Sequence, residues 1–232
     1  MIRVVLEDDH PLVLHMLKDS ISKHADIHLV ATADHGSKLA DLVREHGPDI
    51  AIVDVGLAPD DYNQVAAIRN LKRQFPNVKV LVVTNYDSPL WVRLMVMDVG
   101  VDGYMLKSDA FSLRFGQAIR DVYAGSQFLS PEISAALIAH DKDEVSLTHR
   151  DVQIIMLLDE GKSTDVIAEC LGLSEKRIRN LLVILFKKLG IGRGIGVTQR
   201  VAAVNKAHEL GLLPGEKSGP PSVTFFGKNP GF

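Results

Sequence analysis

The sequence predicts an α/β doubly wound domain built on a five-stranded parallel sheet, followed by a small all-α domain. Three observations support this prediction. Short apolar runs alternate with helical segments in the first half of the chain, the pattern is helical alone from residue 146 onward, and glycine follows each of those later helices. Runs that are apolar throughout are typical of parallel strands buried on both faces, and glycine commonly ends a helix.

The five expected strands are the apolar runs 2–6, 27–31, 50–55, 78–83 and 103–106. Between them, residues 12–23 and 62–75 carry apolar side chains at helical spacing. Strands alternating with helices predict a parallel sheet over residues 1–125. In such a sheet, ligands bind beyond the carboxyl ends of the strands.

The segments beyond the sheet differ in character. We expect a linker with one helix over residues 126–145, where Ser130 is a suitable N-cap and Pro131 the first helical residue. Short helices joined by glycine-containing turns suggest a helix-turn-helix domain over residues 146–211. The Pro- and Gly-rich residues 212–232 are expected to be disordered.

The composition of the 232 residues is ordinary for a soluble globular protein, and the net charge of −3 gives no indication of nucleic-acid binding. The single cysteine, Cys170, excludes an internal disulfide and suits a reducing compartment. The longest unbroken apolar run has six residues, and acidic residues interrupt the N-terminal apolar run. We therefore expect a cytoplasmic chain with no signal peptide and no membrane span.

Charged and polar residues stand where the expected strands end. These residues are Asp8 and Asp9 after the first strand, Asp54 in the third, Thr84 after the fourth and Lys107 after the fifth. The carboxyl ends of parallel strands meet at one edge, where three carboxylates repel one another unless a cation holds them. Oxygen ligands suit Mg²⁺, and a lysine and a hydroxyl beside a magnesium-bound aspartate suit phosphoryl transfer. Capping, packing or solvation explains each residue taken singly, but the five together favour a site.

Four motifs lie at these strand ends: "EDDHP" (7–11), "IVDVG" (52–56), "VVTNYD" (82–87) and "GYMLKSD" (103–109). Together they resemble the flavodoxin-like receiver domain of bacterial two-component response regulators. The resemblance implies that Asp54 is the phosphoacceptor for the phosphohistidine of a sensor histidine kinase. It also implies a Mg²⁺ site made by Asp8, Asp9, Asp54 and the backbone carbonyl of Gly56.

The same resemblance implies a phosphorylation switch. Thr84 and Lys107 would hold the phosphoryl oxygens, and Tyr104 would be the aromatic residue that turns inward with Thr84. Phosphorylation adds negative charge and acceptor oxygens that can move these side chains. We therefore expect a homodimer when the chain is phosphorylated, formed through the surface around residues 85–91 and 103–109 or through another of the receiver faces that this family uses.

Residues 147–191 resemble the LuxR-type helix-turn-helix domain without a gap. The residues at the usual places of that family are Leu147, Thr148, Arg150, Glu160, Gly161, Ile167, Ala168, Leu171, Gly172, Ser174, Leu189 and Gly190. A receiver followed by this domain makes the NarL/FixJ-type response regulator. Between Ser174 and Lys206 there are eight basic residues and one acidic residue, an excess typical of contact with the phosphates of double-stranded DNA.

The third helix of this domain is expected to enter the major groove of DNA. The DNA-binding residues we expect are Lys176, Arg177, Arg179, Asn180, Val183, Lys187 and Lys188. Arg179 and Asn180 can read guanine or adenine, and Val183 can contact a thymine methyl. Leu182 and Ile184 occupy places where the family usually has polar residues. They either extend the packing of the helix, which we favour, or mark a contact with another protein.

Other motifs are interpreted as structural. The "GKST" at 161–164 lacks the glycine that a phosphate loop needs five residues earlier, so it marks the end of one helix and the start of the next. His10 and His15 are five residues apart, a poor helical spacing for a metal pair, and are expected to be surface residues. Cys170 is expected to be buried in the packing.

Three functions compete at this point. The leading hypothesis is a DNA-binding transcription regulator controlled by phosphorylation, which catalyses no reaction except its own phosphoryl transfer and dephosphorylation. The second is an output that binds a partner protein through the apolar third helix, with weak DNA binding. The third is a phosphate sink. The excess of basic residues between Ser174 and Lys206 argues against this hypothesis. The apolar "LLVILF" at 181–186 keeps the second hypothesis open.

Overall fold

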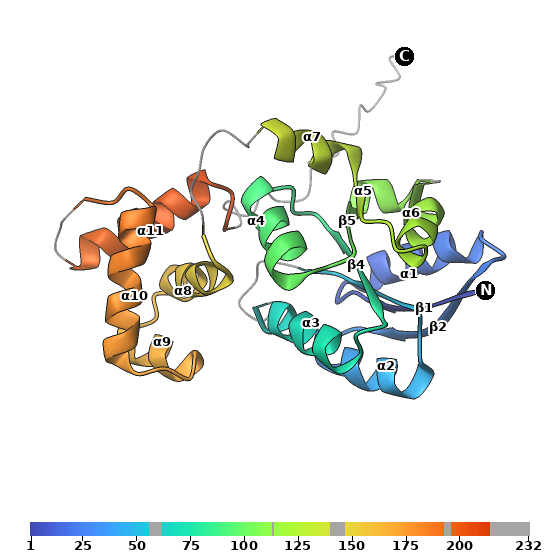
Figure 1. Cartoon of the computed structure of the whole chain (residues 1–232), viewed down its shortest axis with the longest axis horizontal. Coiled ribbons are helices and arrows are strands. Elements are labelled where there is room, and N and C mark those ends of the chain that lie inside the picture. The colour runs from blue at the N-terminus through green and yellow to red at the C-terminus, as the bar shows by residue number, and fades with distance from the viewer. Residues whose placement is uncertain (56–61, 113, 140–146, 193–195, 214–232) are drawn as a thin grey trace, which may run out of the picture.

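The computed structural model describes residues 1–55, 62–112, 114–139, 147–192 and 196–213. The first half of the chain forms one parallel sheet with the strand order β2-β1-β3-β4-β5-β6 (Figure 1). The strands are β1 (Ile2–Glu7), β2 (Ile27–Ala33), β3 (Ile50–Val53), β4 (Lys79–Thr84), β5 (Gly103–Leu106) and β6 (Phe128–Leu129). The doubly wound α/β architecture predicted from the sequence is confirmed.

The predicted number of strands was wrong by one. The sixth strand, β6, lies in the segment expected to be a linker and pairs with β5 through Gly103 with Phe128 and Tyr104 with Leu129. A strand of two residues is too short to give a recognisable alternation of apolar and polar residues. It extends the edge of the sheet and joins the receiver-like first half to the segment that follows.

Both faces of the sheet are covered by helices because the central strands are apolar throughout. In β3, Ile50 and Ile52 belong to one apolar core, whereas Ala51 and Val53 belong to the other. Successive side chains of a strand point to opposite faces, so the two cores lie on opposite sides of the sheet. Helices α1 (Pro11–Ser22) and α6 (Arg114–Tyr123) supply side chains to the first core.

The second face is covered by the helices between β2 and β5. These are α2 (Leu39–His46), α3 (Tyr62–Gln74) and α4 (Pro89–Arg93), which continues as the π-helical segment η3 (Leu94–Val99). A 3₁₀ turn, η1 (Gly36–Lys38), precedes α2, and a short helix, α5 (Lys107–Ala110), follows β5. The carboxyl ends of β1, β3, β4 and β5 therefore meet at one edge of the sheet, which is where the candidate site lies.

The second half of the described chain is helical, as predicted. Its helices are α7 (Pro131–Ala139), α8 (His149–Asp159), α9 (Thr164–Cys170), α10 (Glu175–Lys188) and α11 (Gly196–Glu209). Glycines with left-handed backbone angles follow α8, α9, α10 and α11, at Gly161, Gly172, Gly190 and Gly211. Glycine adopts this conformation without a steric penalty, so these positions end the helices. The expected disordered tail, 212–232, lies mostly outside the described residues.

The apolar side chains between the helices of this domain belong to the same continuous core as those on the second face of the sheet. Ile154 and Ile155 of α8, Ile167 of α9, and Ile178 and Leu185 of α10 are fully buried. Helix α8 begins with a capping box, in which Thr148 accepts a hydrogen bond from the backbone of Asp151 and the Asp151 carboxylate accepts one from the backbone of Thr148. Cys170 is exposed, so the expectation that it is buried was wrong. The buried face of α9 is made by Ile167 and Ala168 instead.

The two halves of the chain touch near α4. Figure 1 shows α8 to α11 gathered at one end of the molecule, beyond α4. Leu212 and Leu213, which follow α11, are buried, and Gly211 lies against Ser88 at the start of α4. Ser88 and Trp91, in the middle of the surface expected to form a dimer, are themselves buried in this structure. Among the described residues, no helix is long and apolar enough to cross a membrane.

Candidate functional site

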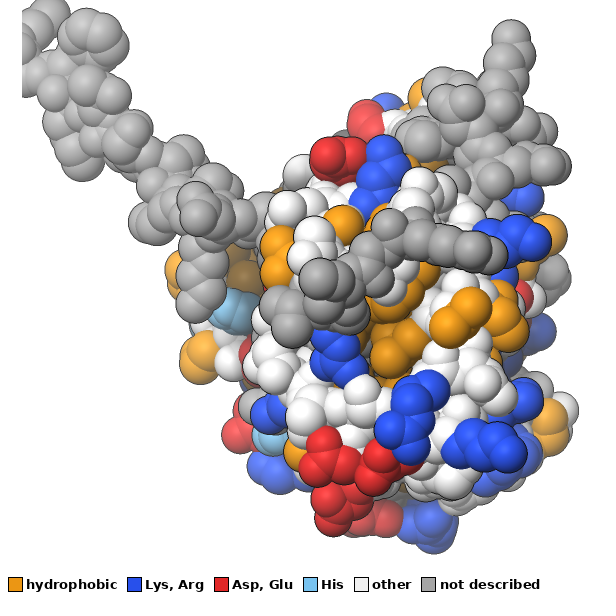
Figure 2. Space-filling model, turned by 90° about the vertical axis from the view of Figure 1, so that its left-hand side faces the viewer, with side chains coloured by type: hydrophobic (Ala, Val, Ile, Leu, Met, Phe, Trp, Pro, Cys, Tyr) orange, Lys and Arg blue, Asp and Glu red, His pale blue; other side chains and the backbone are white. Residues whose placement is uncertain are grey.

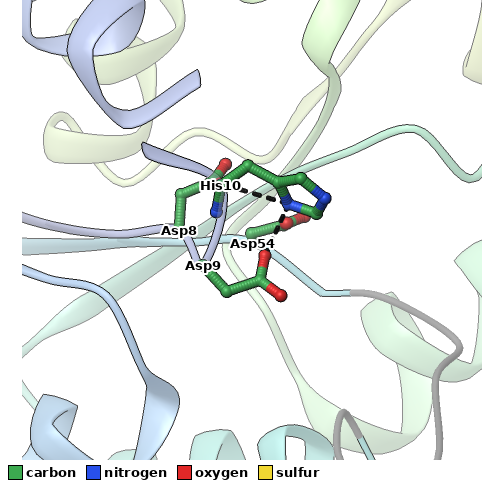
Figure 3. A group of neighbouring side chains, drawn as sticks. All are labelled: Asp8, Asp9, His10 and Asp54. Atoms are coloured by element: carbon green, nitrogen blue, oxygen red, sulfur yellow. Dashed lines mark hydrogen bonds and ion pairs between the residues drawn. The ribbon is translucent and has the colours of Figure 1, made fainter. Parts of the chain in front are cut away.

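Acidic side chains gather where β1 and β3 end. Asp8 and Asp9 follow β1, Asp54 follows β3, and one ligand atom from each lies within 4.8 Å of the others, together with one from His10 (Figure 3). The Asp8 side chain is fully buried, Asp54 is nearly so, and Asp9 is half exposed. The structure thus brings together the carboxylates that the sequence predicted at this edge. Gly56, the fourth expected ligand, lies outside the described residues.

Lys107 contacts this cluster from the end of β5, two strands away from β3 in the sheet. Its ammonium nitrogen Nζ lies 2.7 Å from Oδ2 of Asp54 and 2.8 Å from Oδ2 of Asp8. The lysine side chain is 6% exposed, and a buried ammonium group is tolerated only beside opposite charges. Lys107 is the first residue of α5, directly after β5, so the sheet fixes its position opposite β1 and β3.

Burial and neighbouring charges determine the protonation states of Asp54 and Lys107. Burial raises the pKa of Asp54 to about 6, and the Lys107 charge opposes this rise while Asp8 and Asp9 add to it. Burial lowers the pKa of Lys107, but the Asp54 and Asp8 carboxylates more than offset this effect and leave that pKa above its ordinary value. Near neutral pH, Lys107 is therefore a cation and Asp54 an anion that protonates readily on mild acidification.

His10 belongs to the cluster, although we expected no role for it in the site. Its Nδ1 lies 2.6 Å from Oδ1 of Asp9, and its backbone N–H donates a hydrogen bond to Oδ1 of Asp8 at 2.9 Å. The side chain is 68% exposed, so the expectation of a surface histidine is confirmed. His15 is separate from the cluster and pairs with Asp19. The signal for His10 was its place directly after the two aspartates, not its spacing from His15.

A chain of hydrogen bonds leads away from the acidic cluster. The hydroxyl of Thr84 donates to the carbonyl of Val55 at 2.6 Å, and the backbone N–H of Tyr86 donates to the Thr84 hydroxyl at 3.3 Å. The hydroxyl of Tyr104 donates to the carbonyl of Tyr86 at 2.8 Å. Tyr104 is fully buried, and burial, followed by the charge of Asp87, raises its pKa far above the ordinary value. Tyr104 therefore points inward and stays neutral.

The donor set of the cluster fits a hard divalent cation. Asp8, Asp9 and Asp54 offer carboxylate oxygens, which Mg²⁺ prefers, and the exposed position of Asp9 leaves room for water in the coordination shell. His10 adds a nitrogen at the rim that softer metals also accept. The cluster thus combines a buried nucleophilic carboxylate, a fixed cation and oxygen ligands, which is an arrangement suited to phosphoryl transfer.

A second surface of interest lies on α10. The side chains of Lys176, Arg177, Arg179, Asn180, Val183, Ile184 and Lys187 are exposed on it. Figure 2 shows hydrophobic side chains on this end of the molecule with lysine and arginine side chains beside them. Leu182 is buried, so its expected packing role is confirmed, but Ile184 is 51% exposed and the same expectation for it was wrong.

Two of the basic side chains on α10 have partners within the domain. The Lys188 ammonium lies 2.6 Å from Oδ2 of Asp151, the residue that caps α8, and its side chain is 30% exposed. Arg179 is more exposed and lies 3.2 Å from Glu175, one helical turn earlier. Lys188 therefore ties α10 to α8, whereas the Arg179 pair is a solvent-exposed contact of small energy.

Family models match both halves of the chain. The model described as the response regulator receiver domain matches residues 4–113, and the model of the luxR family of bacterial regulatory proteins matches residues 145–207. The response regulator GacA of Pseudomonas aeruginosa is 33% identical over 82% of this chain and 91% of its own length. The DNA-binding transcriptional activator DevR/DosR of Mycobacterium tuberculosis is 31% identical over 83% of this chain and 90% of its own.

Solved structures resemble the whole described fold. RcsB of Salmonella enterica serovar Typhimurium, bound to the promoter rprA in the presence of phosphomimetic BeF₃⁻, has a TM-score of 0.70. Its sequence is 22% identical, and the match covers 90% of this chain and 99% of that one, so the likeness concerns the fold alone. The response regulator ChrA of a heme-sensing two-component system is 29% identical, with a TM-score of 0.50 and coverage of 91% and 98%.

Proposed function

Because this chain belongs to the response regulators that join a receiver domain to a LuxR-type DNA-binding domain, we propose that phosphorylation of Asp54 by a sensor histidine kinase controls its binding to double-stranded DNA. Members of this family regulate transcription and are not classical enzymes. The observation that carries the proposal for Asp54 is the buried contact of its carboxylate with Lys107, 2.7 Å away. A carboxylate held in this way is positioned to act as a nucleophile and cannot rotate away.

In the proposed reaction, an oxygen of Asp54 attacks the phosphorus of a phosphohistidine. The new P–O bond forms as the P–N bond breaks, and the leaving imidazole nitrogen keeps the electron pair. The Lys107 ammonium group lies within contact of Asp54 and can hold a phosphoryl oxygen as negative charge shifts onto it. Asp8, Asp9 and Asp54 would hold Mg²⁺, with the carbonyl of Gly56, and the cation would neutralise charge on the phosphoryl oxygens.

The same hydrogen bonds support a switch. An acyl phosphate on Asp54 offers acceptor oxygens to the Thr84 hydroxyl, which now donates to Val55. Any movement of Thr84 alters its bond with the backbone of Tyr86, and Tyr86 accepts the hydroxyl of Tyr104. We propose that this path carries the signal to the segment around Ser88, and that the phosphorylated chain forms a homodimer. Since Ser88 is buried and its hydroxyl donates to the carbonyl of Leu210, a dimer through 85–91 requires this contact between the two domains to open.

The DNA contacts that we propose lie on α10. Lys176, Arg177 and Lys187 are exposed beside the groove-facing residues and can contact phosphates, while Asn180 and Arg179 can reach base edges. Val183 faces the same side, and Lys188, with its partner Asp151, stands at the end of the helix. What supports DNA over a protein partner is the excess of eight basic residues over one acidic residue between Ser174 and Lys206.

Intact mass spectrometry tests the phosphorylation. With acetyl phosphate and Mg²⁺, the wild-type chain should gain one phosphoryl group, and Asp54→Asn should gain none. Asp87→Asn, a matched change at an exposed aspartate of a neighbouring loop, should be phosphorylated as wild type. An equal adduct on Asp54→Asn, or an adduct formed in EDTA, contradicts the assignment.

A genomic footprint with and without acetyl phosphate tests the output. We expect protected sites whose occupancy rises on phosphorylation of the wild type and does not change for Asp54→Asn. Sedimentation with beryllofluoride should show a dimer at tens of micromolar. Absence of any protected site, together with efficient phosphorylation, would favour an output through a partner protein.

A further inference from the structure

The exposed face of α10 carries an apolar pair, Val183 and Ile184, halfway along the helix. Successive residues are separated by about 100° around the helix axis, so Asn180 and Lys187 lie opposite the buried Ile178, Leu182 and Leu185, and Val183 and Ile184 lie on either side of that line. Val183 is 68% exposed, and Ile184 is 51% exposed. Halfway along the helix, apolar side chains therefore flank the midline of the surface that we propose to face DNA.

Internal packing does not explain this pair. The apolar side chains that α10 contributes to the domain core are Ile178, Leu182, Leu185, Phe186 and Leu189, all of which are buried. Val183 and Ile184 project away from that core. A single exposed apolar side chain needs no explanation, but two adjacent ones in the centre of a ligand-facing helix mark a contact with another molecule.

The charges around the pair identify the kind of molecule. Lys176 and Arg177 stand at one end of the exposed face and Lys187 at the other, all exposed and without a carboxylate partner among the ion pairs of the described residues. A basic rim around an apolar centre complements a ligand with a negative rim and apolar groups between. The major groove of DNA provides both, since phosphates border it and the C5-methyl groups of thymine project into it.

We propose that Val183 and Ile184 add to the specificity of this protein, beside Arg179 and Asn180, by recognising the C5-methyl groups of thymines. The two side chains differ in direction around the helix and in height along it, so they contact neighbouring base pairs. Asn180, on the same face, can pair with the N6 and N7 atoms of an adenine beside them. The preferred site is thus rich in A·T pairs. This inference rests on the proposed DNA binding and deepens it.

Replacement of thymine by uracil tests the inference, because it removes the methyl group and leaves the base pair intact. Full-length protein with beryllofluoride and Mg²⁺ first selects sites from a pool of random duplexes. Each thymine of a selected site is then changed to uracil in turn, and affinity is measured by fluorescence anisotropy. We expect one or two positions at which uracil weakens binding about fourfold, the value of one buried methyl group.

Variants assign the effect to the side chains. In Val183→Ser the uracil penalty should disappear at one of these positions, and in Ile184→Ser at the other. Val201→Ser changes another exposed valine, on α11, and should keep both penalties, whatever it does to overall affinity. All three positions are at the surface, so the variants should fold as the wild type does, which circular dichroism checks.

The possible results distinguish failure of this inference from failure of the proposed DNA binding. If the protein binds a specific site but uracil weakens binding at no position, Val183 and Ile184 do not recognise thymine methyl groups. The proposed DNA binding would still hold in that case. Uracil penalties that persist in both serine variants assign the methyl contacts to other residues and also overturn this inference. If no duplex is bound with or without beryllofluoride, the proposed function fails as well, and the apolar pair is then a surface for a protein.

Discussion

The hydroxyl of Ser88 donates a hydrogen bond to the backbone carbonyl of Leu210, 3.3 Å away, and so joins the receiver domain to the end of α11. Gly211 follows Leu210, and a Cβ atom at this glycine would lie 3.3 Å from the Ser88 side chain. Ser88 is two residues beyond Tyr86, whose carbonyl accepts the hydroxyl of Tyr104. The hydrogen bonds that begin at Thr84, beside the proposed phosphorylation site, therefore end two residues from the contact between the domains.

We predict that a larger side chain at Ser88 uncouples DNA binding from phosphorylation. Ser88→Leu has no space beside Gly211 and should push the domains apart. Coupling between two sites typically changes affinity by about 5- to 150-fold, so the ratio of DNA affinities with and without beryllofluoride should fall toward one. Anisotropy with a selected duplex measures this ratio.

The matched control is Ser126→Leu, which places the same side chain at an exposed serine of the same domain. It should keep the full response to beryllofluoride. A normal response in Ser88→Leu would show that the contact with Leu210 does not transmit the signal.

The buried Lys107 should stabilise the metal-free receiver. Lys107→Met keeps the length of the side chain but leaves the carboxylates of Asp54 and Asp8 facing one another without a cation. Loss of one partner of a buried ion pair costs about 3–5 kcal/mol. Mg²⁺ supplies positive charge to the same carboxylates, so it should recover more free energy of unfolding in the variant than in the wild type.

Urea denaturation followed by tryptophan fluorescence measures this effect. Trp91 is the single tryptophan of the chain and is buried in the receiver, so its emission reports the unfolding of that domain. Lys176→Met, on the exposed face of α10, is the control and should leave the transition in place. Equal stability of Lys107→Met and the wild type in EDTA would exclude the proposed role.

Asp54 should make the metal-free protein less stable as the pH rises. Its pKa is about 6 in the folded chain and near 3.9 in an unfolded one. Between these values the folded chain keeps a proton that the unfolded chain has released, so the free energy of unfolding falls as the pH rises from 4 to 6. The full difference corresponds to about 3 kcal/mol at most.

Asp54→Asn removes this titration. In EDTA, the variant should gain stability over the wild type as the pH rises from 4 to 6, and the gain should stay constant above that window. Groups that do not interact with Asp54 titrate alike in both proteins and cancel in the difference. Mg²⁺ at pH 8 should reverse the order, because it stabilises the ionised carboxylate. A difference that does not vary with pH would contradict the raised pKa.

The sequence predicted the acidic site well because the topology of a parallel sheet leaves little choice. Asp8, Asp54 and Lys107 are far apart in the chain, but each follows an apolar strand, and parallel strands end at one edge. His10 was not assigned to the site because its role depends on how the chain turns after β1. That turn brings its ring back to Asp9, which no regular spacing encodes.

Other features depended on packing that no local pattern specifies. The two residues of β6 are extended because they pair with β5, not because of their own alternation. Ile184 was expected to be packed because it is apolar, yet it lies on the exposed face of α10. Helical period alone would have placed it there. The expectation for Ile184 was based on its hydrophobicity and not on the direction in which the helix points its side chain. That direction also explains why Leu182 is buried.

The last prediction separates two adjacent lysines at the end of α10. Lys187 is exposed, whereas Lys188 is held 2.6 Å from Asp151, whose side chain is 5% exposed. Lys187→Ala should weaken binding to all duplexes alike and lower the slope of log affinity against log salt by about one unit, since it removes one phosphate contact. Lys188→Ala should lower the melting temperature of the helical domain, because Asp151 would then be buried without its cation.

Salt series on a selected and a scrambled duplex, with thermal unfolding of both variants, measure the two effects. Arg179→Ala should show a third kind of effect, because Arg179 would leave Glu175 to contact a base. The substitution should cost about 1–3 kcal/mol of binding free energy on the selected duplex and little on the scrambled one. A Lys188→Ala variant with normal stability and a reduced salt slope would make Lys188 a phosphate contact rather than a link between α10 and α8. Unchanged specific binding by Arg179→Ala would mean that this residue does not face the groove.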